Sequence, residues 1–227
     1  MPFFFDKGRK MASLSEKNNE KKEPKEPADL ASMISMAMDR PEMRTVAVYG
    51  DINEERCAEA VYGLLALDMT ARSLVAENQG TEDEKVTEVV EPIEFYISSY
   101  GGQATEMFAV YDVMRDIRER TPIFTYGIGK VMSAGVLLLA AGTDGQRRIG
   151  KNCRVMIHGV VAGQHGHIAD IENEFTEVKS TQKMYIEALA EETDMTQKYI
   201  KKLMDKKTNV YLDAAEAVNL GIADIIV

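Results

Sequence analysis

Short apolar segments that end near glycine alternate along this chain with segments of helical period, and this order restricts the fold most. The segments RTVAVYG, PIEFYIS and TPIFTYGIG, which begin at Arg44, Pro92 and Thr121, have the length and composition of buried strands. NCRVMIHG, which begins at Asn152, is a fourth such segment. Helical segments lie between them, which is typical of a parallel sheet with helices packed on it. We therefore predict an α/β fold with a largely parallel sheet.

The helical segments are defined by their period and by their caps. Asn53 is a candidate N-cap residue for the first of them. Helices are predicted over residues 54–68, 103–119, 133–142, 168–191 and 196–206, followed by a short helix and a closing strand within 213–227. The longest of these segments is 168–191.

Composition excludes several classes of protein. A chain of 227 residues that is 45% hydrophobic can build one sizeable core, and two cysteines are too few for a disulfide framework. The net charge of -10 disfavours nucleic acid as a partner, and no apolar run is long enough to span a bilayer. We expect a cytoplasmic protein that binds neither nucleic acid nor a membrane.

Two charged stretches are predicted to lie outside the core. Residues 1–28 mix lysine and glutamate with proline, which is typical of a disordered arm, and leave 29–227 as a single domain. Residues 71–91 hold six acidic side chains against two basic ones and are predicted to form an exposed acidic loop or hairpin.

Ser133 begins the apolar segment SAGVLLLAAG and has two interpretations. Serine is among the best N-cap residues, so it can serve only to cap this buried helix. Alternatively it is a nucleophile, because a helix N-terminus offers the partial positive charge and free N–H groups that a developing oxyanion requires. The pattern around Ser133 leaves both possibilities open.

Two further features lie where predicted strands end. Gly101 and Gly102 follow one strand and either form a tight turn or let a ligand approach the backbone. His158 ends another strand, where catalytic groups of α/β proteins tend to project. His165 and His167 form an HxH pair, but no cysteine or carboxylate stands at metal-ligand spacing from them, so we expect no metal site.

Taken together, these segments resemble one known family. MSAGVLLLAAGT, GQRRIGKNCRVMIHG, the upstream SSYGG and the downstream YLDAAEAVNLGIAD are similar to the proteolytic subunit of the Clp protease, ClpP, a serine peptidase of the crotonase-like fold. The resemblance covers about residues 44–227. It implies repeated β-β-α units with a largely parallel sheet and a long protruding helix that packs two rings together, entered through a segment near 163–172.

The resemblance also implies roles for individual residues. Ser133 matches the nucleophile of the family and His158 its general base. Gly102 and the backbone N–H of Ala134 match the oxyanion hole. The third member of the triad is usually an aspartate, but the matching position holds Asn209, with Asp205 as the alternative.

Other departures lie close to these residues. Tyr100 replaces the usual proline before the glycine pair, and Lys130, Val131 and Met132 replace small residues before Ser133, which is expected to narrow the substrate pocket. The region before residue 44 lacks the N-terminal axial loop and the first helix motif of the family, and the acidic stretch has no counterpart of its length in the family.

The implied activity is hydrolysis of unfolded polypeptides through an acyl-enzyme, inside two stacked seven-membered rings. No phosphate-binding GxxxxGK[ST] occurs, so we expect no cofactor in this chain and an ATP-driven unfoldase of the AAA+ class as partner. The main alternative is a catalytically impaired, ClpR-like structural subunit of a mixed ring. A Ser-Lys dyad using Lys130 and a crotonase-type acyl-CoA enzyme are further alternatives.

Overall fold

The computed structural model describes residues 43–77, 85–163, 165–205 and 208–227. The predicted arm of 1–28 lies outside these residues, so the arm and the domain boundary near residue 29 stay predictions. The strands are β1 (Thr45–Ile52), β2 (Arg72–Glu77), β3 (Lys85–Val90), β4 (Ile93–Gly102), β5 (Ile123–Met132), β6 (Arg148–Ile149), β7 (Arg154–Ile157), β8 (Val210–Leu212) and β9 (Ile225–Ile226). The helices are α2 (Glu54–Met69), α3 (Ala104–Arg118), α4 (Ala134–Ala140), α5 (Ile168–Glu192), α6 (Gln197–Met204) and α7 (Ala214–Asn219).

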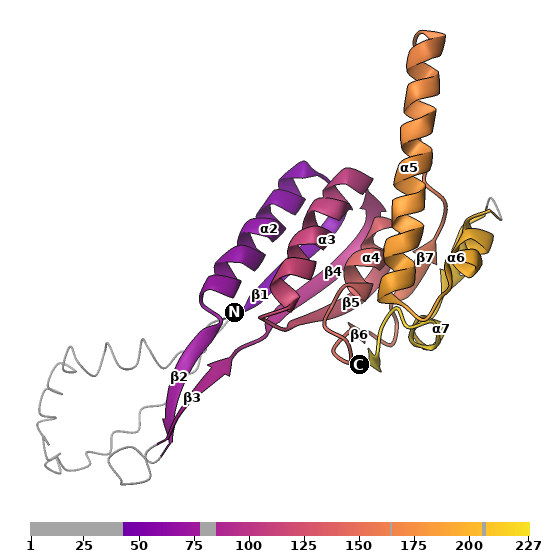
Figure 1. Ribbon diagram of the computed structural model, residues 1–227. Helices are drawn as coiled ribbons and strands as arrows, with labels where there is room; N and C mark the ends of the chain where they lie inside the picture. Colours follow the sequence, from indigo (N-terminus) through magenta and orange to yellow (C-terminus); the bar gives the residue numbers. More distant parts are fainter. Residues whose placement is uncertain (1–42, 78–84, 164, 206–207) are drawn as a thin grey trace, which may run out of the picture. The chain divides into compact units, whose positions relative to one another are not determined.

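The main sheet has seven strands within the described residues (Figure 1). Its order is β1-β4-β5-β6-β9, and β7 lies beside β5 with β8 beside β7. All pairs are parallel except β7 with β8. The prediction of an α/β fold with a largely parallel sheet is therefore confirmed.

The helices that follow β1 and β4 pack side by side against the sheet (Figure 1). In α3, Met107, Val110, Met114 and Ile117 recur at helical spacing and are buried, which gives the helix one apolar face. Asn53 caps α2 as predicted, since its side chain accepts a hydrogen bond from the backbone N–H of Arg56.

Helix α4 is buried on every side, as its composition predicted. All seven of its residues are buried between the sheet and α3 and α5. A helix this short cannot be stable alone, because nucleation costs more than a few intrahelical hydrogen bonds return. Its formation therefore depends on the surrounding core.

Strand lengths differ from the sequence prediction at two places. Strand β5 continues past Gly129 to Met132, because its last three residues pair with β7. Strands β6 and β8 have two and three residues and carry no periodicity of their own. They form because neighbouring strands supply their hydrogen-bond partners.

Residues 72–90 contain an antiparallel pair of strands, β2 with β3, in a separate sheet. Of the two alternatives for the acidic stretch, the structure has the hairpin. Leu74, Val86 and Val89 are exposed on it. Near its base, Arg72 pairs with Glu88 at 3.4 Å, and the Glu91 N–H donates to the carbonyl oxygen of Ala71.

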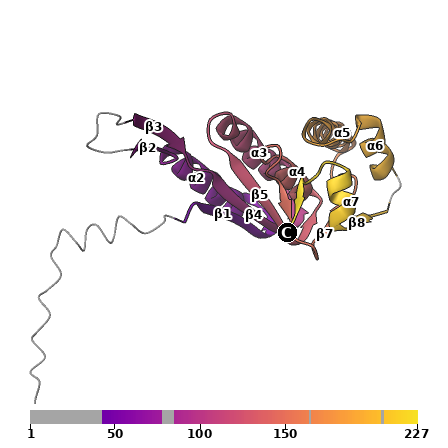
Figure 2. The ribbon, with the colours of Figure 1, turned by 90° about the horizontal axis from the view of Figure 1, so that it is seen from below.

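The long helix α5 has two different halves. Ile168, Ile171 and Phe175 in the first half are exposed, whereas Tyr185 and Leu189 in the second half are buried in the core. The first half extends away from the sheet, and the view along the helix shows α6 beside the second half (Figures 1 and 2). The predicted protruding helix is therefore confirmed.

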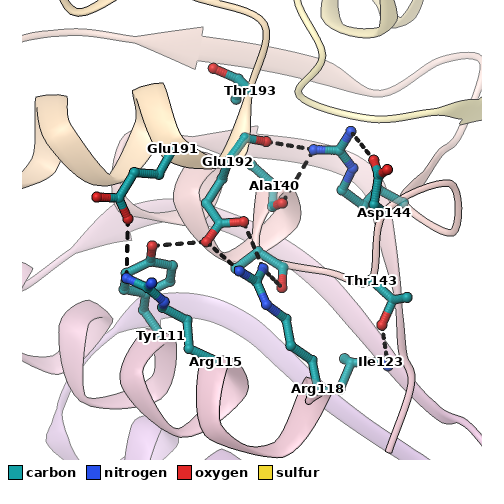
Figure 3. Close-up of polar contacts among 12 residues, drawn as sticks. Tyr111, Arg115, Arg118, Ile123, Ala140, Thr143, Asp144, Glu191, Glu192 and Thr193 are labelled. Atoms are coloured by element: carbon teal, nitrogen blue, oxygen red, sulfur yellow. Dashed lines mark hydrogen bonds and ion pairs between the residues drawn. The ribbon is translucent and has the colours of Figure 1, made fainter. Parts of the chain in front are cut away.

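A network of charged side chains holds the end of α5 (Figure 3). The carboxylate of Glu192 accepts hydrogen bonds from Arg118 at 2.6 and 2.8 Å and from the Tyr111 hydroxyl at 2.9 Å. Arg147 donates to the Glu192 carbonyl and pairs with Asp224. Removing one partner of such a buried pair costs about 3–5 kcal/mol, because the other charge stays buried.

Asp68, at the end of α2, is held in a similar way. It accepts hydrogen bonds from Thr121 at 2.6 Å and from Arg120 at 2.7 and 2.9 Å. Burial alone would raise the pKa of this carboxyl, but these hydrogen bonds and the arginine charge outweigh burial and lower the pKa.

Candidate active site

Three strand ends bring the predicted site residues together. Strand β5 lies between β4 and β7, and all three run parallel. The glycine pair ends β4, Ser133 follows β5, and His158 follows β7. Because the carboxyl ends of parallel strands meet at one edge of a sheet, the three features lie close together although they are spread over residues 101–158 of the sequence.

Ser133 occupies the turn between β5 and α4 in a strained conformation. Its φ of 53° and ψ of -122° make it the only non-glycine residue with positive φ in the described part of the chain. Such a conformation costs roughly 1–3 kcal/mol and is found at functional sites. A sharp strand-to-helix turn of this kind exposes the hydroxyl of a nucleophilic serine.

The interpretation of Ser133 as a residue that caps α4 with its side chain is wrong. Ser133 stands at the N-cap position of α4, but its side chain makes no capping hydrogen bond. Its backbone N–H instead donates to the carbonyl oxygen of Met156 at 2.8 Å, which joins it to β7. The side chain does not cap the helix because φ of Ser133 is positive, whereas a capping serine normally has an extended backbone.

A cavity of about 620 Å³ is lined by four of the predicted residues: Ser133, His158, Gly102 and Ala134. Its other lining residues are Asp51, Ile52, Asn53, Tyr100, Gln103, Ala104, Met107, Gly159, Val160, Val161 and Tyr185. The lining combines apolar side chains with polar ones, and a cavity of this size and mixed lining can hold a peptide segment or a small organic ligand.

The glycine pair packs too tightly for any side chain. A Cβ atom on Gly102 would lie 2.1 Å from the carbonyl oxygen of Ile52, and one on Gly101 would lie 2.6 Å from the Cβ of Ser133. Gly101 has a φ of 101°, and its N–H donates to the hydroxyl of Ser99 at 2.9 Å. The pair therefore does more than turn the chain, because it lets β4 approach both β1 and the nucleophile.

His158 lines this cavity and also a second one of about 350 Å³, which is lined by both candidates for the third position, Asn209 and Asp205. Strands β7 and β8 pair antiparallel with Val155 opposite Leu212 and Ile157 opposite Val210. His158 and Asn209 are the residues that come next after this last pair, one just beyond each strand.

Asp205 instead stands at the C-cap of α6. In this structure no hydrogen bond joins His158 to Ser133, Asn209 or Asp205, all of which are described residues.

Three of the residues that are expected to narrow the substrate pocket, Tyr100, Lys130 and Val131, have different environments. Val131 is fully buried in the core, and Tyr100 lines the cavity with 63% of its surface exposed. The ammonium of Lys130 lies 4.6 Å from the centre of the Tyr100 ring. Lys130 is not among the residues that line the cavity, so the geometry does not favour a Ser-Lys dyad.

Two residues of α5 contact the site and were not predicted. The hydroxyl of Tyr185 donates to the carbonyl oxygen of Ser133 at 2.8 Å. The side chain of Gln182, one turn earlier, accepts a hydrogen bond from the N–H of Val160, two residues after His158. The only signal in the sequence is the helical spacing, which does not reveal a partner 52 residues away.

Among the described residues, no cluster of three or more His, Cys, Asp and Glu side chains could hold a metal ion. None of the helices in the described ranges is both long and apolar enough to cross a membrane.

The chain is similar to known proteins over most of its length. The sequence model of the family described as Clp protease matches residues 81–227. A relative from Prochlorococcus marinus, named ATP-dependent Clp protease proteolytic subunit 2, is 33% identical over 185 residues, which cover 81% of this chain and 88% of the relative. A relative from Deinococcus radiodurans, named ATP-dependent Clp protease proteolytic subunit, is 29% identical and covers 81% of this chain and 86% of its own. Subunit 1 from Corynebacterium glutamicum is 33% identical, with coverages of 70% and 71%.

Proposed function

Because this chain belongs to the Clp protease family, we propose that it hydrolyses polypeptides as a serine endopeptidase with Ser133 as nucleophile. One observation carries the proposal: Ser133 is held in a strained strand-to-helix turn and shares a cavity with His158. A strained serine at the carboxyl edge of a sheet, beside a histidine, is the arrangement that acyl transfer requires.

In the proposed reaction, Ser133 Oγ attacks the carbonyl carbon of the scissile bond while His158 takes its proton. The oxyanion accepts hydrogen bonds from the N–H groups of Gly102 and Ala134, which belong to residues lining the same cavity. The C–N bond then breaks, and His158 returns the proton to the leaving amine. Water hydrolyses the resulting ester by the same steps in reverse order.

The third position is assigned to Asn209, supported by the register of β7 with β8. Its amide oxygen can accept a hydrogen bond from the imidazole and select a tautomer. An amide carries no charge, so it stabilises the imidazolium less than an aspartate would. Asp205 is the alternative, since it lines the same small cavity as His158.

The asparagine also supports a second candidate function, that of a catalytically impaired, ClpR-like structural subunit in a mixed ring. In this case the chain builds the assembly while other subunits cleave. The presence of both Ser133 and His158 at the cavity favours the active enzyme.

We further propose that the protein acts as two stacked seven-membered rings in the cytoplasm and receives substrates from an AAA+ unfoldase. The exposed apolar residues Ile168, Ile171 and Phe175 on the first half of α5 support a contact between rings. Cys57 and Cys153 are free thiols, which fits a reducing compartment. Light scattering coupled to size-exclusion chromatography tests the assembly, and a stable monomer would contradict it.

The decisive experiment compares the parent protein with Ser133→Ala in a fluorogenic peptide assay and in labelling by a fluorophosphonate probe. Ser73→Ala, a change at an exposed serine of β2, is the control. Cleavage and labelling that disappear only in Ser133→Ala support the active enzyme. Absence of both from the parent supports the structural subunit, and unchanged cleavage by Ser133→Ala refutes the assignment of the nucleophile.

A further inference from the structure

Tyr185 connects the long helix to the backbone of the proposed nucleophile. Its hydroxyl donates to the Ser133 carbonyl at 2.8 Å, and its side chain lines the main cavity. The residue is 5% exposed, and burial raises the pKa of its phenol. The phenol therefore stays protonated at working pH and remains a hydrogen-bond donor.

The contact acts on a residue whose backbone needs support. A strained conformation such as that of Ser133 persists only when its surroundings hold it. The N–H of Ser133 is held by Met156 at 2.8 Å, and its carbonyl accepts hydrogen bonds from the N–H of Val136 at 3.0 Å and from Tyr185. Tyr185 is the one side chain that hydrogen-bonds to this backbone within the described residues.

The same helix is also joined to the segment that carries the histidine. Gln182 accepts a hydrogen bond from the N–H of Val160 at 3.1 Å, one helical turn before Tyr185. The second half of α5 thus contacts the chain beside Ser133 and the chain that follows His158. A donor on this helix has a defined position relative to both residues.

We propose that Tyr185 is a positioning residue, whose hydrogen bond to the Ser133 carbonyl keeps the nucleophile in the conformation that presents Oγ to the cavity. This inference rests on the proposed function of Ser133. Tyr185 takes no part in proton transfer, because its hydroxyl is directed at a backbone carbonyl.

The test is Tyr185→Phe, which removes one oxygen atom and leaves the ring in place. The Ser133 carbonyl keeps its bond from Val136, so the change weakens the support without removing it. Loss of one hydrogen bond corresponds to a decrease of about 3- to 10-fold. We expect this decrease in kcat and in the second-order rate constant of fluorophosphonate labelling, with KM unchanged.

Tyr111→Phe is the matched control. Tyr111 is 3% exposed, its hydroxyl donates to Glu192 at 2.9 Å, and it is not among the residues that line the main cavity. The two variants lose the same atom and one buried hydrogen bond each. The bond of Tyr111 is to a carboxylate and is the stronger of the two, so a general loss of stability affects the control at least as much. Thermal unfolding of each variant measures that shared effect.

The outcomes separate the inference from the function on which it rests. A selective decrease in Tyr185→Phe, in kcat and labelling alike, supports the inference. The inference is overturned if Tyr185→Phe is as active as the parent, or if Tyr185→Phe and Tyr111→Phe lose activity equally. In either case, Ser133-dependent cleavage by the parent leaves the proposed function intact. A parent without Ser133-dependent labelling overturns both.

Discussion

Substitution of Gly102 by alanine tests the proposed oxyanion hole most directly. The new Cβ atom would lie 2.1 Å from the carbonyl oxygen of Ile52, whereas carbon and oxygen atoms in contact are normally about 3.3–3.6 Å apart. The obstacle is backbone within a sheet and cannot rotate away. Strands β1 and β4 must therefore separate locally by about 1 Å, which moves the Gly102 N–H.

The size of the effect follows from that displacement. A misplacement of about 1 Å in a catalytic site costs about 10²-fold in rate, and loss of one oxyanion donor costs about 10²- to 10³-fold. We expect kcat/KM of Gly102→Ala for a fluorogenic peptide to decrease by about 10²- to 10³-fold, chiefly through kcat.

A glycine in a roomier place serves as the control. The Cβ atom of Gly150→Ala would meet nothing closer than 3.5 Å, so this variant should keep the parent activity. Circular dichroism and the elution volume of both variants show whether the fold and the assembly survive. If Gly102→Ala folds, assembles and cleaves like the parent, the reasoning about the oxyanion hole is refuted.

Three further predictions concern the third triad position, an ion pair and the thiols. Asn209→Asp should raise kcat by about tenfold or more, because a carboxylate stabilises the imidazolium, whereas Asp205→Asn should change kcat little. A large loss of kcat in Asp205→Asn, with little change in Asn209→Asp, would assign the third position to Asp205. The folded state lowers the pKa of Asp68. The stability that its carboxylate contributes is therefore complete above the pKa of the unfolded chain and is lost as pH falls through the folded pKa. We expect the free energy of unfolding in urea to depend less on pH between about 5 and 2 in Asp68→Asn than in the parent. Burial raises the pKa of both Cys57 and Cys153 to about 11, and a disulfide reagent at neutral pH should modify them only after unfolding; rapid modification of the native protein would contradict their burial.

The elements of the fold that could be predicted are those with a local signal. Strands such as β4 and β5 are runs of apolar residues, and α3 repeats its apolar side chains at helical spacing. The structure of each of these segments can therefore be predicted from its own residues. The hairpin of β2 with β3 was one of two alternatives, because a charged stretch of that length does not reveal whether its strands pair. Strands β6 and β8 were missed because two or three residues carry no period.

In the candidate site, too, some features could be predicted from the sequence and others could not. Ser133, His158 and the glycine pair stand at strand ends that the sequence marks, and parallel strands bring those ends to one edge. Asn209 and Asp205 both lie beside His158 at the second cavity, because β8 and α6 pack near the end of β7, and their sequence positions alone do not reveal this. The strained backbone of Ser133 likewise depends on contacts with distant residues.

The sequence by itself determined the main strands and helices and their order along the chain, the residues available for chemistry and the resemblance to the family, because residue type and spacing are local properties. Only the tertiary structure decided that Ser133 is strained rather than a capping residue, and that the hydroxyl of Tyr185 of α5 donates to its carbonyl oxygen. The physical reason is that a hydrogen bond between residues 52 positions apart forms only when packing of α5 against the core brings them together. No local pattern in the chain encodes that distance.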